Sequence, residues 1–164
     1  MRLINWFLGL FSRNVKYFPK PEVFNTLPKA YKGALKDLGI REILGSRMNA
    51  PRILEYHSYT NLDAKTDEIA WCSSAMCCWQ EESGIKGTRS AAARSWLKWG
   101  EKEENPTEGC VVVFSRGKSW QGHVGFYVKS DKKYVWCLGG NQGDSVSVRK
   151  YKKSKVLDYR KAKL

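Results

Sequence analysis

Hydrophobic positions in the first two thirds of the chain recur at helical spacing. Residues 29–38 place apolar side chains on one stripe and stop at Gly39, which is typical of a helix end. Residues 51–59, 72–82 and 90–99 show further helical patterns. Prolines interrupt residues 17–28, which predicts an extended arm before the first of these helices.

After Gly109 the pattern becomes β-branched and alternating. It predicts strands over residues 110–114, 122–128, 134–138 and 145–148, with a last edge strand over 156–159. Helices followed by consecutive antiparallel strands predict an α+β fold.

The length of 164 residues suits one domain with a single core, and 42% hydrophobic residues is typical of a globular chain. We divide it into an N-terminal apolar segment with its extended arm, 1–28, and a domain, 29–164. The run Met1–Phe11 is too short to span a bilayer and lacks a small-residue cleavage site, so we expect no cleaved signal peptide. It is interpreted either as a helix packed on the domain or as an interfacial segment.

The net charge of +13 is unevenly distributed. Residues 63–109 carry six Lys/Arg against nine acids, whereas residues 110–164 carry thirteen against three. The basic run 149–155 is interpreted either as a solvated face or as a surface that attracts an anionic envelope. Because no known nucleic-acid-binding signature is present, we expect no specific nucleic-acid partner.

Five cysteines are present, and one of them is placed to act as a nucleophile. Their odd number and the adjacent pair Cys77–Cys78 argue against a disulfide framework, and two histidines without a C-x-x-C pair argue against a metal site. We expect no metal and no cofactor. Cys72 opens a predicted helix, where the helix dipole lowers a thiol pKa and free N–H groups can hold an oxyanion.

His123 is the candidate base. It lies in a predicted strand between Gly122 and Gly125, which allow close approach of backbone or substrate. Asn141, after the next strand, could accept a hydrogen bond from the imidazole and orient it. On these residues alone His123 could also be structural.

Five segments in order resemble the phage and bacterial branch of the NlpC/P60- and CHAP-like cysteine peptidases. They are residues 71–74, 93–100, 112–116, 122–126 and 138–142. The resemblance implies a reduced papain-like core, with N-terminal helices packed on a four- to six-stranded antiparallel sheet. It assigns Cys72, His123 and Asn141 as the catalytic residues. One departure is Cys110, where the resemblance leads us to expect Asp after Gly109.

Four other positions are candidate substrate contacts, each with a structural alternative. Trp71 could form a cleft wall or pack in the core, and Glu68, next to Asp67, could bind a stem-peptide amine or help the helix begin. Arg116 could bind a carboxylate or be a surface charge. Gln142 could support the site beside Asn141.

The resemblance implies an endolysin-like peptidoglycan hydrolase. It would cut the stem peptide or the muramoyl-alanine linkage with a Cys-His-Asn mechanism, as a monomer. Without a cleaved signal, we expect synthesis in the host cytoplasm and action on the wall or in the periplasm after holin-type or other release. The alternatives are an antibacterial toxin or effector with an immunity partner and, with less support, a basic nucleic-acid-binding module.

Overall fold

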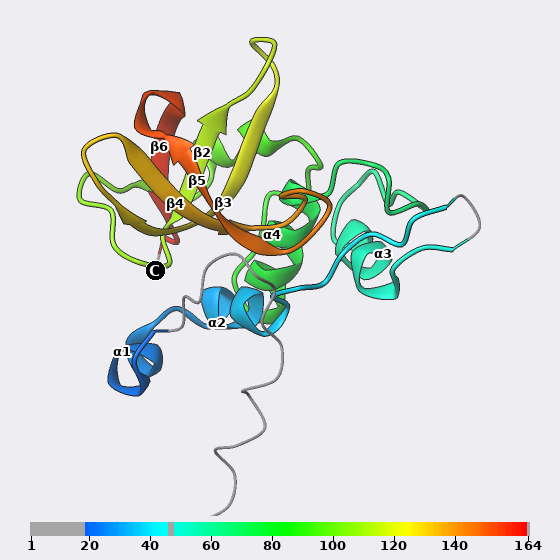
Figure 1. Cartoon of the computed structure of the whole chain (residues 1–164), viewed down its shortest axis with the longest axis horizontal. Helices are drawn as coiled ribbons and strands as arrows, with labels where there is room; N and C mark the ends of the chain where they lie inside the picture. The colour runs from blue at the N-terminus through cyan, green and yellow to red at the C-terminus, as the bar shows by residue number, and fades with distance from the viewer. Residues whose placement is uncertain (1–18, 46–47, 164) are drawn as a thin grey trace, which may run out of the picture.

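The helices precede the sheet along the chain, as the hydrophobic pattern predicts (Figure 1). The computed structural model describes residues 19–45 and 48–163, so the apolar run Met1–Phe11 lies outside it. Its helices are α1 (Pro21–Thr26), α2 (Lys29–Lys36), α3 (Pro51–Ser58), α4 (Cys72–Glu82) and the 3-10 helix η1 (Ala93–Lys98). In this part of the chain, none is long and apolar enough to cross a membrane.

Two of these helices differ from the prediction. The expected extended arm contains α1, because Pro21 occupies its first turn, where a missing N–H costs nothing, and the carbonyl of Lys20 accepts the N–H groups of Val23 and Phe24. The helix predicted over 90–99 is shorter and of the 3-10 type. The Ser90 hydroxyl accepts the N–H of Ala92 in a local turn, which competes with an earlier helix start.

Six strands form one antiparallel sheet in the order β1-β6-β2-β3-β4-β5. They are β1 (Glu101–Lys102), β2 (Val111–Ser115), β3 (Gly122–Ser130), β4 (Tyr134–Gly139), β5 (Ser147–Lys152) and β6 (Val156–Lys161), with a 3-10 turn, η2 (Lys153–Lys155), before β6. Residues 156–159 were predicted to form an edge strand, and this prediction was wrong, since β6 lies between β1 and β2. The strand predicted at 145–148 begins later and includes much of the basic run.

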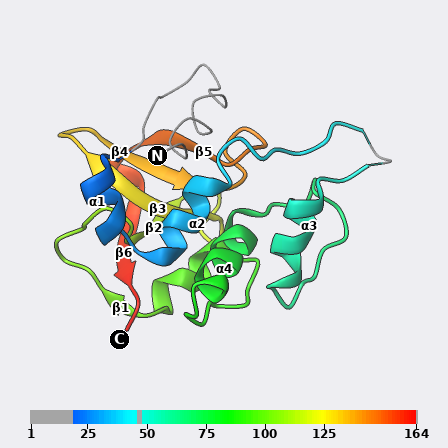
Figure 2. The ribbon, with the colours of Figure 1, turned by 90° about the horizontal axis from the view of Figure 1, so that it is seen from below.

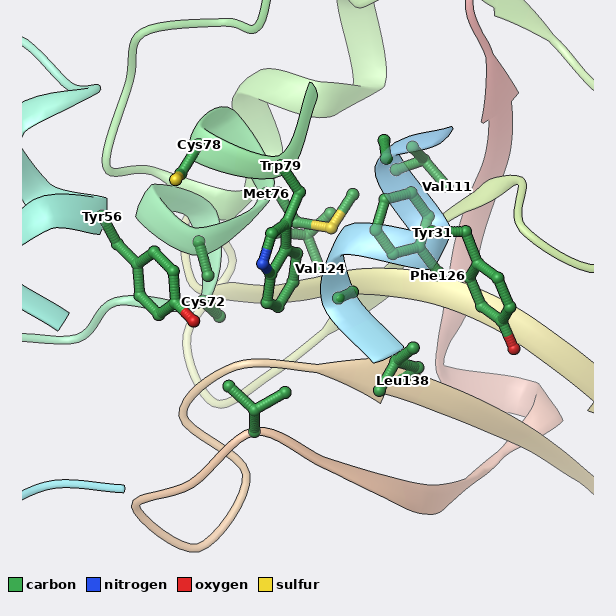
Figure 3. Close-up of a cluster of buried hydrophobic side chains, with 14 of the residues drawn as sticks. Tyr31, Tyr56, Cys72, Met76, Cys78, Trp79, Val111, Val124, Phe126 and Leu138 are labelled. Atoms are coloured by element: carbon green, nitrogen blue, oxygen red, sulfur yellow. The ribbon is translucent and has the colours of Figure 1, made fainter. Parts of the chain in front are cut away.

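The main core lies between one face of the sheet and the helices α2 and α4 (Figures 1 and 2). Trp79 of α4 and Tyr31 of α2 both pack against Phe126 of β3, with ring centroids 6.0 and 5.6 Å apart (Figure 3). A second cluster on the other face is built around Phe114 and Cys137. Alternation along β2 to β4 therefore buries both faces of the sheet.

One carboxylate joins the three helices. Asp37, which follows α2, accepts hydrogen bonds from the Tyr56 hydroxyl of α3 (2.7 Å) and the Trp79 indole of α4 (2.8 Å). It also forms an ion pair with Arg52 of α3 (3.0 Å). These partly buried, charge-assisted bonds fix the position of α4 relative to α2 and α3.

Candidate active site

The candidate nucleophile is the first residue of α4. Cys72 is 7% exposed and belongs to the main core cluster (Figure 3). Its sulfur lies against the backbone of Val124 in β3, the residue after His123. The packing of α4 on β3 thus brings the two sequence-predicted residues, Cys72 and His123, to the same place in the fold.

The resting thiol of Cys72 is not activated in the way the sequence suggests. Burial raises its pKa. The N–H groups of Val124 and Ser73 and the positive charge of Arg116 oppose this effect but do not overcome it. The expectation of a pKa lowered by the helix dipole was therefore wrong, because removal of water from the sulfur outweighs the dipole.

His123 is also buried and neutral. Burial lowers its pKa to about 4, and the nearby charge of Arg116 contributes in the same direction. Its Nε2 atom lies 3.1 Å from the Oε1 atom of Gln142, a contact that partly opposes the effect. A neutral imidazole is the form that can take a proton from a thiol.

The amide of Gln142 can point only one way. Its Nε2 group donates to the carbonyls of Cys137 (3.3 Å), Gly139 (3.2 Å) and Ser147. Its Oε1 atom accepts the Tyr151 hydroxyl (2.8 Å). Since Oε1 can only accept, the Nε2 atom of His123 must carry the hydrogen, and Nδ1 of the neutral ring is left as the base.

Asn141, the predicted orienting residue, is not the one that contacts the imidazole. Asn141 has φ 54°, in the left-handed region that Asn tolerates better than most residues. The side chain that contacts His123 is that of its neighbour Gln142, which is 2% exposed. The sequence therefore located the right loop and assigned the role to the wrong one of two adjacent amides.

Tyr151 was not predicted from the sequence, because it stands among lysines. Its ring stacks on His123 (centroids 5.2 Å apart) and on Phe114 (4.6 Å). Burial raises its pKa above the ordinary value, so the hydroxyl stays a donor to Gln142. The alternation of β5 was the available signal, since it turns Tyr151 to the opposite face from Lys150 and Lys152.

Gly125, which the sequence predicts as a position of close approach, and Gly140, which it does not, both lie against neighbouring elements. A Cβ atom on Gly125 would collide with the sulfur of Cys137 and would lie 2.7 Å from the carbonyl of Leu138. A Cβ atom on Gly140 would lie 2.5 Å from the ring of Trp71. Both positions thus bring β4 and its following loop against the elements that carry Cys72 and His123.

The predicted substrate contacts have separate outcomes. Trp71 is 0% exposed, stacks on Tyr56 and donates its indole N–H to Glu42 (2.8 Å), so its role as a cleft wall was wrong and it is a core residue. Glu68 is exposed. Asp67 instead binds the backbone N–H groups of Ile43 (3.0 Å) and Ala50 (2.8 Å), which holds the loop before α3.

Arg116 lies beside the candidate pair, in the connection between β2 and β3. It is exposed, and its charge lowers the pKa values of both Cys72 and His123. The same connection exposes Trp120, with 69% of its surface accessible. Arg94 donates to the carbonyl of Gln121 (2.7 Å) and supports this hairpin.

The remaining cysteines and the second histidine are also buried. All five cysteines are buried and free of disulfides, and burial raises the pKa of Cys110 to about 12. His57 contacts the Ser74 hydroxyl through Nδ1 (3.1 Å). Within residues 19–45 and 48–163, no group of three or more His, Cys, Asp or Glu is arranged to hold a metal ion.

No family model and no curated protein matches the sequence. Among solved structures, the chain is similar to a lipoprotein-like protein of the NLP/P60 family from Staphylococcus aureus subsp. aureus Mu50, with TM-score 0.52 and 15% identity. The similarity covers 94% of this chain and 46% of that chain, so this chain spans about half its length. The likeness confirms the predicted fold, an α+β structure with a papain-like core of the NlpC/P60 type.

Proposed function

We propose that the chain is a cysteine hydrolase that cleaves an amide bond of peptidoglycan, either in the stem peptide or at the muramoyl-alanine linkage. The observation that carries the proposal is the contact of His123 Nε2 with the locked Oε1 atom of Gln142 (3.1 Å), next to Val124, whose backbone lies against the Cys72 sulfur. This contact leaves Nδ1 as the basic nitrogen, and a general base needs its ring held in one tautomer and orientation.

In this mechanism Nδ1 of His123 takes the proton of the Cys72 thiol as the sulfur attacks the scissile carbonyl carbon. Backbone N–H groups in the first turn of α4 stabilise the oxyanion, and within the described chain no side chain caps them. The amide C–N bond then breaks while the imidazolium gives its proton to the leaving nitrogen. Water, deprotonated by His123, releases the acyl group from sulfur.

Exposed charges near the pair fit a stem peptide. Glu68 could pair with an amine of the peptide and Arg116 with a carboxylate, because both side chains reach solvent. Burial, followed by the charges of Asp144, Asp67 and Glu68, raises the pKa of Glu42, so several carboxylates lie near one another beside the start of α4. The peptidoglycan assignment itself is supported by the sequence resemblance and by the NlpC/P60 fold.

The test is digestion of purified sacculi, with mass spectrometry of the released muropeptides. Wild-type protein should release fragments, Cys72→Ala should release none, and EDTA should leave the release unchanged. New glycan-linked lactyl carboxylates would identify an amidase, and shortened stem peptides an endopeptidase. Full release by Cys72→Ala would contradict the proposal.

A further inference from the structure

Six lysines gather at the end of β3, on β5 and in the connections that follow these two strands. Lys129 lies near the end of β3, and Lys150 and Lys152 lie on β5. Three more are in the connections β3–β4 and β5–β6, and all six side chains are exposed: Lys129, Lys132, Lys133, Lys150, Lys152 and Lys153. The N–H of Lys153 donates to the carbonyl of Lys133 (2.8 Å), which joins the two connections. We call these six lysines the basic end.

The strand register orders part of this surface. Lys129 and Lys150 are both cross-strand partners of Trp136, from opposite sides of β4. The Lys129 ammonium lies 5.1 Å from the centroid of the Trp136 ring, and the Lys150 ammonium lies 4.9 Å from that of Tyr134. These cation–π contacts hold the two ammonium groups over the sheet, each on one face of an aromatic ring.

The basic end keeps a net positive charge, because its six lysines have one carboxylate, that of Asp131, among them. In the described part of the chain, none of its six lysines forms a salt bridge. Asp131 lies in the same turn, but its carboxylate accepts the backbone N–H groups of Lys133 and Tyr134, both at 2.7 Å. These hydrogen bonds, followed by the charges of Lys150 and Lys153, lower its pKa, so it remains an anion engaged with its own turn.

We propose that the basic end binds a phosphodiester polymer attached to the bacterial wall. Clustered ammonium groups bind such polyanions through release of their counterions. Among the described residues, no exposed large hydrophobic side chain belongs to the basic end, so it offers nothing to insert into a bilayer. The Trp136 and Tyr134 rings each carry a lysine ammonium, so a nucleic-acid base that stacked on that face would have to displace it.

The choice of a wall polymer rests on the proposed function, since substrate and polymer would then lie on the same particle. Lys129 follows His123 by six residues, which corresponds to about 20 Å along β3. Lys150 and Lys152 lie nearer to the site, because they flank Tyr151, whose ring stacks on His123, but their side chains are exposed on the other face of β5. Both connections also lie on the side of the sheet away from α3 (Figures 1 and 2).

Co-sedimentation of the full chain with Gram-positive sacculi tests this proposal. The Cys72→Ala background prevents digestion, and sacculi treated with hydrofluoric acid lack the phosphodiester polymer. The triple variant Lys129→Gln/Lys150→Gln/Lys152→Gln is matched by Lys29→Gln/Lys36→Gln/Lys86→Gln, which removes the same charge from exposed helix and loop positions. Thermal melting of each variant verifies folding.

We expect the basic-end triple to weaken binding to untreated sacculi by about tenfold or more at 0.15 M salt and to reduce the slope of log K against log salt by ~2–3. The control triple should change binding by about twofold or less, and treated sacculi should bind all proteins equally weakly. Equal losses in the two triples, undiminished binding to treated sacculi, or tighter binding to anionic vesicles or single-stranded DNA would each overturn the proposal.

The same triple in the Cys72-containing protein separates this inference from the proposed function. Its hydrolysis of small soluble muropeptides should match that of the wild type. Polymer-dependent binding without any hydrolysis by the wild type would remove the enzymatic proposal and leave the binding surface. Hydrolysis without polymer-dependent binding would remove the proposed binding surface and leave the enzymatic proposal.

Discussion

The two histidines of the chain occupy buried sites that are alike in several respects. His57 lies in α3 and His123 in β3, both are at most 2% exposed, and burial lowers the pKa of each. Each has one ring nitrogen 3.1 Å from a side-chain oxygen. Burial, pKa and contact distance therefore do not identify the catalytic residue.

The partners distinguish the two sites. The Ser74 hydroxyl beside His57 can rotate to donate or accept, so it does not by itself select a tautomer, and the backbone of Thr66 and Ile69 also lies against this imidazole. Gln142 is locked by its own contacts and selects one tautomer of His123, whose ring also stacks on Tyr151. His123 is therefore distinguished from His57 by its hydrogen-bond acceptor, the Gln142 amide, which is held in one orientation.

The largest predicted difference comes from making the same substitution at both histidines. His123→Gln should lower kcat/KM by ~10²–10⁴-fold, because the amide takes no proton from Cys72. His57→Gln should leave kcat/KM within about threefold of the wild type while lowering the free energy of unfolding by ~1–3 kcal/mol. Hydrolysis assays and urea melts measure the two effects. Similar activity losses in both variants would contradict the assignment of His123 rather than His57 as the base.

The next comparison separates the two adjacent amides. Gln142→Ala should lower kcat by ~10–10²-fold, since His123 loses its orienting acceptor. Asn141→Gly keeps the left-handed backbone of that position and should have little effect on kcat. A larger loss in Asn141→Gly than in Gln142→Ala would restore Asn141 to the role that the sequence assigned to it.

A smaller effect is expected at Arg116. Its charge lowers the pKa of His123, so Arg116→Ala should raise that pKa and move the acid limb of the pH profile of kcat/KM to higher pH. The loss at acidic pH should be ~2–5-fold. Lys118→Ala, two residues along the same hairpin, is the control, and coincident pH profiles for both variants and the wild type would refute a role for Arg116.

Acidic pH should also lower the stability of the fold. Both histidines have folded-state pKa values below the unfolded value of about 6.5, so the unfolded chain binds more protons as the pH falls. The free energy of unfolding should be fully retained above about pH 6.5 and should decrease toward pH 4, with a limiting slope of ~1.4 kcal/mol per pH unit for each histidine. Denaturant melts between pH 7 and pH 5 measure this loss. The double variant His57→Gln/His123→Gln should show a flatter dependence, and an equally steep one would assign the loss to other groups.

The sequence predicts the elements of this fold better than the contacts between them. Helix α4 has the predicted bounds because its apolar stripe begins at Cys72 and Gly84 follows its end. The position of β6 beside β2 was not predictable from order along the chain, since pairing of distant strands depends on tertiary packing. Local patterns thus determined the strands but not their order in the sheet.

In the candidate active site, too, local features were predictable from the sequence and tertiary contacts were not. Cys72 and His123 stand out through helix position and flanking glycines, which are local signals. Burial of the thiol, the choice of Gln142 over Asn141 and the inward face of Tyr151 depend on how the loop after β4 meets the sheet. A pKa set by burial follows from three-dimensional packing, so the helix-dipole argument alone predicted the wrong direction for Cys72.

The most direct test of the account is to trap the acyl-enzyme. Wild-type protein is mixed with soluble muropeptide, quenched in acid within the first turnover and digested for peptide mass spectrometry. We predict an added mass equal to the acyl part of the substrate on the peptide that contains Cys72, and none in His123→Gln. An adduct on any other residue, or efficient hydrolysis without any adduct on Cys72, would contradict the account.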